Sequence, residues 1–211
     1  MDDYAHLLNW KLLGGSHPFP GPDGGTCVNE AAIVAAGFAY RRVGHAGDLP
    51  TCFCPVIGAF SVWLNDEIED DVLRMRLLSP FVTRLAGTRG SPQDQQARLE
   101  VLRLRLWAQM TPRQRRRRLT HAHGHLLLGE ALGRWTVRRF SIRNAATARE
   151  LIRVAGFVVA GLEVAQRPAF HAAMAQALDA MLRIGPQASP HETDLLVERM
   201  ETAKRVAVSV G

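Results

Sequence analysis

The sequence predicts an all-α fold of seven or eight helices, because helix-start signals recur along the chain while strand signals are nearly absent. Three segments combine a hydroxyl residue suited to the N-cap, a proline at the first helical position and a polar or acidic residue at the third. They are Ser91-Pro92-Gln93-Asp94, Thr111-Pro112-Arg113-Gln114 and Ser189-Pro190-His191-Glu192. The nearest approach to strand alternation, TVRRFSI at residues 136–142, is short.

Helical periodicity places the other elements. Behind the first of these starts, apolar residues recur at helical spacing, at Leu99, Leu102, Leu106 and Met110. This spacing leaves Arg98, Arg103 and Arg105 for the solvent-facing side of that helix. We also expect helices near residues 28–38, 55–64, 67–86, 145–166 and 168–184. Asn144 is the expected N-cap of the helix at 145–166, and Gly185 is expected to close the helix at 168–184.

The composition divides the chain into two expected lobes. Residues 1–90 form a Pro/Gly-rich N-terminal lobe, and residues 91–211 form a basic helical lobe packed on it. The segment Ala86–Gln93, which contains Gly and Pro, is the natural joint. A single continuous domain is the alternative. The 211 residues, of which 47% are hydrophobic, suffice for a real core.

Composition also bounds the location of the protein. The N-terminus, MDDYAHLLNWK, lacks the basic and apolar regions of a secretory signal. The longest apolar run, Val154–Leu162, is far shorter than the roughly 20 residues that a membrane-spanning helix needs. Three cysteines at irregular spacing do not form a disulfide framework. We therefore expect a soluble, cytoplasmic protein with reduced thiols and no membrane partner.

Positive charge is concentrated in the C-terminal part of the chain. Residues 1–70 carry three basic and nine acidic side chains, whereas residues 71–211 carry 23 basic and 11 acidic ones. Between Arg98 and Arg153 there are 14 arginines, opposed only by Glu100, Glu130 and Glu150. Such a block favours a nucleic acid, a nucleoprotein complex or an acidic protein as partner. The alternative is a solvated face in a chain that uses Arg for 24 of its 26 basic residues.

The densest part of this block is the run RQRRRRL at residues 113–119. Its guanidinium groups are suited to neutralising phosphates, although consecutive arginines on a helix point around much of its circumference. The candidate binding residues are Arg113, Arg115, Arg116, Arg117, Arg118, Arg134, Arg138, Arg139 and Arg143. Trp107 and Trp135 are suited either to stacking on bases or to filling the core.

A second candidate site lies where a Gly- and Pro-rich loop meets the helix expected at 28–38, in the stretch GSHPFPGPDGGTCVNEAAIVAAG at residues 14–36. There, the helix dipole would lower the pKa of the Cys27 thiol and favour a nucleophilic thiolate. His17 or His45 would then act as base, and Asp23 or Asp48 would orient it. The alternative is structural: Thr26 or Asp23 caps the helix, and Cys27 is a small buried apolar residue.

Metal and cofactor sites are not predicted. The first 54 residues contain His and Cys side chains, but Cys52-Phe-Cys54 lacks the two-residue spacing of a zinc knuckle, and no second pair follows. His121 and His125 share a helix face, yet Arg115–Arg118 lie one turn upstream, and neighbouring cations oppose a bound dication.

Three blocks resemble a group of uncharacterised bacterial proteins. The blocks are WKLLGGSHPFPGPDGGTCVNEAAIVAAG, CFCPVIGAFSVWLND and RLAGT, and together they span roughly residues 8–90. The resemblance implies no activity and transfers no functional residue. The group carries Ser where this chain has Cys54, which weakens any role for Cys54 as an obligatory ligand.

Together these patterns favour a non-enzymatic binding protein with an arginine-rich helical surface. The competing hypothesis is an enzyme with a thiol or metal site centred on Cys27, with His17 and Asp23 beside it.

Overall fold

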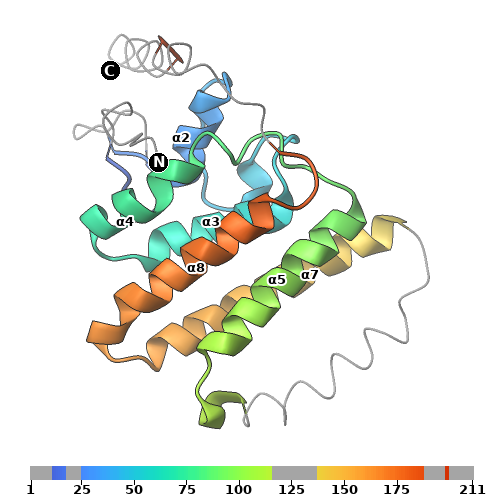
Figure 1. Cartoon of the computed structure of the whole chain (residues 1–211). Coiled ribbons are helices and arrows are strands. Elements are labelled where there is room, and N and C mark those ends of the chain that lie inside the picture. The colour runs from blue at the N-terminus through green and yellow to red at the C-terminus, as the bar shows by residue number, and fades with distance from the viewer. Residues whose placement is uncertain (1–10, 18–24, 116–136, 188–197, 200–211) are drawn as a thin grey trace.

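The computed structural model of the chain describes residues 11–17, 25–115, 137–187 and 198–199, and their regular structure is helical (Figure 1). The only extended pairing among these residues is an isolated parallel bridge between Leu12 and Thr26. The predicted all-α class is confirmed. The α-helices are α2 (Val28–Ala35), α3 (Pro55–Glu67), α4 (Asp71–Leu78), α5 (Pro92–Gln109), α7 (Val137–Ala160) and α8 (Arg167–Leu182). Three 3-10 turns, η1 (Ala46–Asp48), η2 (Ser79–Phe81) and η3 (Val164–Gln166), lie between them.

Helix α3 is central to the packing, because it contacts α2, α5, α7 and α8. Helix α5 packs in turn against both α7 and α8. Every residue of α2 is buried, which makes this short helix part of the interior rather than an amphipathic surface element. Buried apolar side chains from all six α-helices form one core, to which residues on both sides of the segment 86–93 contribute. This core holds the loops that precede α2 against α3.

Helices α5 and α7 run parallel, with α8 returning beside them (Figure 1). Near the N-terminal ends of the pair, the side-chain amide of Asn144 in α7 donates a hydrogen bond to the Pro92 carbonyl at 3.1 Å. Near the C-terminal ends, Gly161 lies beside the Gln114 side chain, so close that a Cβ at position 161 would be 3.0 Å from Nε2 of Gln114. Arg115 and Val137 therefore lie at opposite ends of the pair.

The helix starts predicted behind Ser91 and Thr111 are confirmed. The hydroxyl of Ser91 accepts a hydrogen bond from the Asp94 amide at 3.1 Å, and the Asp94 carboxylate accepts one from the Ser91 amide at 2.7 Å. Thr111 and Gln114 make the same reciprocal pair at 3.2 and 2.8 Å. Each pair satisfies donors that a helix N-terminus leaves free. The third predicted start, at residues 189–192, lies outside the described residues.

The single helix predicted near residues 67–86 is wrong. Helix α3 continues to Glu67, the chain then extends through Ile68, and α4 begins at Asp71. The break follows from a local cap, because the Asp70 carboxylate accepts a hydrogen bond from the Leu73 amide at 2.8 Å and so starts a new helix. Helix α4 ends at Leu78, and η2 follows.

The helix predicted near residues 145–166 has different ends in the structure. Helix α7 begins at Val137 and ends at Ala160, so the strand-like segment at 136–142 is almost entirely helical. Asn144 is a buried residue within α7 and not an N-cap, because its side chain contacts the start of α5 instead. Gly185 follows α8 with a φ of 69°, as predicted, and Gly37 follows α2, which ends at Ala35 and not near residue 38, with a φ of 84°. Both are left-handed conformations that glycine adopts easily at helix C-termini.

Arg98 corrects the predicted solvent face of α5. Its side chain is fully buried, whereas Arg103 and Arg105 are exposed as expected. The Arg98 guanidinium donates to the Thr88 carbonyl at 2.7 Å and to the Ile184 carbonyl, which ties the start of α5 to the end of α8. Arg98, the first of the 14 arginines between residues 98 and 153, therefore stabilises the fold and does not belong to the exposed basic surface.

Candidate functional site

Cys27 is the N-cap of α2. Its sulfur accepts a hydrogen bond from the Glu30 amide at 3.4 Å, and the Glu30 carboxylate accepts one from the Cys27 amide at 2.9 Å, which forms a capping box. The thiol is only 2% exposed. The structural alternative from the sequence is therefore confirmed in one part and wrong in the other: Cys27 is buried as expected, but Cys27 itself, and neither Thr26 nor Asp23, occupies the cap.

The expected activation of the Cys27 thiol is wrong in direction. Burial raises the pKa of the thiol, and the negative charge of the Glu30 carboxylate raises the pKa further. These two effects outweigh the hydrogen bonds that the sulfur receives at the helix N-terminus. The thiol therefore stays protonated at neutral pH, which is the state that disfavours nucleophilic attack.

The Glu30 carboxylate, and not the thiol, is the centre of this region. Oε2 accepts hydrogen bonds from the Thr26 hydroxyl at 3.1 Å and from the Cys27 amide at 2.9 Å. Oε1 accepts them from the Ser16 hydroxyl at 3.1 Å, the His17 amide at 3.2 Å and the Val43 amide at 3.0 Å. Glu30 is fully buried. Five donors from three separate chain segments thus compensate one buried carboxylate.

His17 reaches this centre through its backbone and not through its ring. The ring Nε2 lies 2.8 Å from the Gly14 carbonyl, so it serves as a donor to that oxygen. The Tyr40 hydroxyl donates to the His17 carbonyl at 2.5 Å, and burial, then Glu30, raise the pKa of Tyr40. We call Ser16, His17, Thr26, Cys27, Glu30, Tyr40 and Val43 the Glu30 cluster. Asp23, the proposed orienting residue, lies outside the described residues.

The other predicted pair, His45 and Asp48, is engaged with its own turn. Nδ1 of His45 accepts a hydrogen bond from the Gly47 amide at 3.1 Å, and Oδ2 of Asp48 accepts one from the His45 amide at 3.0 Å. Both residues thereby cap η1. Across the part of the chain that the structure describes, no three His, Cys, Asp or Glu side chains gather as a metal site would require.

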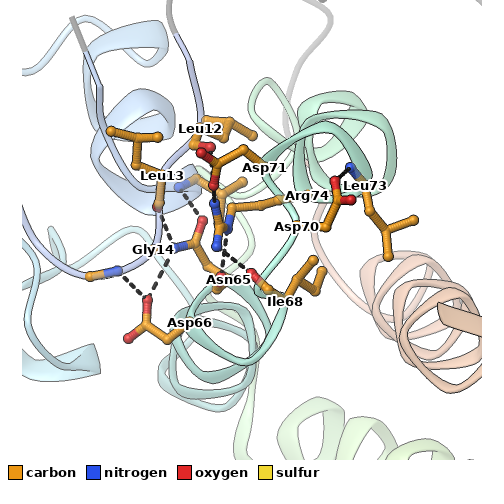
Figure 2. Close-up of polar contacts among 12 residues, drawn as sticks. Leu12, Leu13, Gly14, Asn65, Asp66, Ile68, Asp70, Asp71, Leu73 and Arg74 are labelled. Atoms are coloured by element: carbon orange, nitrogen blue, oxygen red, sulfur yellow. Dashed lines mark hydrogen bonds and ion pairs between the residues drawn. The ribbon is translucent and has the colours of Figure 1, made fainter. Parts of the chain in front are cut away.

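A second polar network holds residues 12–15 in place beside the Glu30 cluster (Figure 2). Asn65 of α3 donates from its side-chain amide to the Leu13 carbonyl at 2.9 Å and accepts from the Val28 amide at 3.1 Å. The Gly15 amide donates to the Asp66 carboxylate at 2.8 Å. One asparagine thus links the loop and the start of α2 to α3.

Arg74 of α4 completes this network from the other side (Figure 2). Its buried guanidinium donates to the Asn65 carbonyl at 2.8 Å and to the Leu12 carbonyl at 3.3 Å, and it also contacts Ile68 and Asp71. These contacts fix the chain that carries Ser16 and His17. The sequence interpretation missed Glu30, Asn65 and Arg74; only Glu30 had a local signal, since a glutamate three residues after the cap indicates a capping box.

The structure makes a sharp prediction for thiol reactivity. Cys27 and Cys54 are buried, while Cys52 is half-buried. Titration of the folded protein with an aromatic disulfide reagent should therefore modify one thiol rapidly, and unfolding in urea should release all three. Cys52→Ser should abolish the rapid reaction, whereas Cys27→Ser should leave it unchanged. Rapid modification at Cys27 in the folded protein would restore the nucleophile hypothesis.

We call residues 113–136 the arginine-rich segment. Its described part, residues 113–115, lies just after the C-terminal end of α5. Arg113 is exposed and Arg115 is half-buried. The Arg115 guanidinium lies over the ring of Trp107, with its carbon 5.5 Å from the ring centroid. Of the other predicted binding residues, Arg138, Arg139 and Arg143 belong to α7, where only their backbone is described. Arg116, Arg117, Arg118 and Arg134 lie outside the described residues.

No family model, no curated protein and no solved structure matches the chain. None of the helices that the structure describes combines the length and the apolar character needed to cross a bilayer.

Proposed function

We propose that the protein is a non-enzymatic binding protein that engages nucleic acid through its arginine-rich surface. The observation that carries this proposal is the positive charge that remains on α5 and α7 after Glu100 and Glu150 have paired with arginines of their own helices. Glu100 is engaged by Arg103 at 2.7 Å, and Glu150 by Arg153 at 3.6 Å. Exposed arginines remain on α5, beyond its C-terminal end and on α7. Arg105, Arg113 and Arg149 make no ion pair among the described residues.

Guanidinium groups without carboxylate partners suit phosphate as a ligand. Each presents a planar fork of donors that matches two phosphate oxygens and remains charged at any physiological pH. A row of such groups neutralises several phosphates and releases the counterions condensed on a nucleic acid. An acidic protein or a nucleoprotein complex offers negative charge as well, and both are alternative outcomes of the experiment below.

The contacts around Cys27 support this proposal by weakening its competitor. The thiol is protonated and buried, and it is occupied as a helix cap. The His17 ring is bonded to the Gly14 carbonyl. Neither group is placed as a nucleophile and base require, which is a direct hydrogen bond between the two side chains. The Glu30 cluster is better explained as the structure that anchors the loops to α2.

The test is the salt dependence of binding. If four arginines of the segment each neutralise a phosphate of duplex DNA, the slope of log affinity against log salt is about −3.6. Replacing Arg115, Arg116, Arg117 and Arg118 together by Ala should flatten the slope by up to about that amount. Fluorescence anisotropy of a labelled oligonucleotide, titrated with the protein across a salt series, measures this slope.

The matched control removes the same charge elsewhere. Arg41, Arg76, Arg89 and Arg183 are all exposed and lie outside the segment. Replacing these four by Ala should leave the slope close to that of the parent. If the parent binds no nucleic acid at low salt, or both quadruple variants flatten the slope equally, the segment is not a nucleic-acid site. Retained binding of an acidic protein would then identify that partner class instead.

A further inference from the structure

Trp107 is exposed at the surface of α5, and only part of its ring is packed against the protein. It belongs to the last turn of the helix, and 36% of its surface remains exposed. Leu104, three residues earlier and therefore on the same face, is 53% exposed. Tryptophan and arginine are the residue types that most often contribute the binding energy of an interface.

Arg115 fixes the neighbourhood of this ring. Its Nε donates to the Trp107 carbonyl at 3.1 Å, and its Nη2 donates to the Ala108 carbonyl at 3.4 Å. These bonds hold the guanidinium over the indole, where the charge is attracted by the π electrons. The cation and the ring are thus positioned together before any ligand arrives, so less side-chain entropy is lost on binding.

From this arrangement we infer that Trp107 and Arg115 form a stacking site for an unpaired base, which makes the preferred ligand a single-stranded nucleic acid. The inference rests on the proposed function. A base offers a flat π face to an indole, and an adjacent guanidinium adds a cation–π contact and a phosphate contact. In a duplex the bases are already stacked on one another, so their faces are not available to Trp107.

The experiment compares three probes on the full-length protein: a short oligothymidylate, a duplex of the same length and inorganic polyphosphate. Trp107→Ala should weaken binding of the single strand by about 5- to 150-fold, since stacking of a base on an aromatic ring contributes about 1–3 kcal/mol. Binding of the duplex and of polyphosphate should stay unchanged, because both rely on charge alone. Trp107→Phe should retain most of the single-strand affinity.

Phe157→Ala is the matched control, because Phe157 of α7 is an aromatic residue of similar exposure, at 46%. It should leave all three affinities unchanged. Circular dichroism checks that each variant is folded; if Trp107→Ala is not, Trp107→Leu supplies the same comparison. Equal single-strand affinity of the parent and the variant lacking the ring would overturn the stacking site. The proposed function would survive that result if the quadruple arginine variant still flattens the salt slope. The proposed function fails if the parent binds neither nucleic acid, or if both quadruple variants flatten the salt slope equally.

Discussion

Replacing Glu30 by alanine is expected to lower the free energy of unfolding by more than about 3 kcal/mol. The substitution leaves five donors without their acceptor, in a region where every neighbour that contacts the carboxylate is wholly or partly buried. Each buried donor without a partner costs about 1–3 kcal/mol, less where water enters. Urea denaturation followed by circular dichroism measures the change.

Two variants make the Glu30 experiment specific. Glu30→Gln keeps the shape and one oxygen but turns an amide toward donors, so its cost should be smaller but still clear. Glu69→Ala removes a carboxylate that is 86% exposed and pairs with Arg167 at 3.4 Å, and it should cost at most about 1 kcal/mol. A Glu30→Ala protein as stable as the Glu69→Ala protein would show that the cluster does not anchor the loops.

Replacing Arg98 by alanine should destabilise the protein by about 3–5 kcal/mol. The change opens a cavity and removes donors from the carbonyls of Thr88, Ile184 and Pro186, which lie 2.7 to 3.5 Å from the guanidinium nitrogens. Arg98→Lys retains the charge and most of the volume, but a single ammonium cannot reach all three oxygens, so an intermediate loss is expected.

Arg105→Ala, on the exposed side of the same helix, is the control for Arg98. Its effect should stay within about 0.5 kcal/mol, because the side chain makes no ion pair among the described residues. The two variants remove the same charge from α5, so unequal loss of stability in denaturation measurements separates burial from charge. Equal losses would contradict the structural role of Arg98.

The fold class could be predicted from the sequence, and so could those helix ends that depend only on neighbouring residues. The capping boxes at Ser91 and Thr111 were predictable because the hydroxyl, the proline and the third residue act locally. The sequence predicts a break between the helices at 55–64 and 67–86, but the break lies later, between Glu67 and Asp71, because α4 begins where the Asp70 side chain caps it. Asn144 fits the pattern of a cap, and only contact with the distant Pro92 carbonyl shows otherwise.

The candidate site was less predictable for the same physical reason. The dipole of a helix N-terminus suggests a lowered pKa for Cys27, but the sign depends on burial and on the Glu30 charge, which emerge only after folding. Arg98 was assigned to solvent because its acceptors lie up to 88 residues away in sequence. Asn65 and Arg74 likewise act on carbonyls more than fifty residues distant. No local pattern encodes such contacts.

The parallel course of α5 and α7 limits how the arginine-rich segment can be altered. Helix α7 has 24 residues and is about 36 Å long at 1.5 Å per residue. Because Arg115 and Val137 lie at opposite ends of the pair, any connection between them must bridge about that distance. An extended chain covers about 3.3–3.6 Å per residue, so roughly ten residues are the minimum. Excising the segment with a shorter linker would force the two helices out of register, whereas charge-neutralising substitutions leave the connection intact.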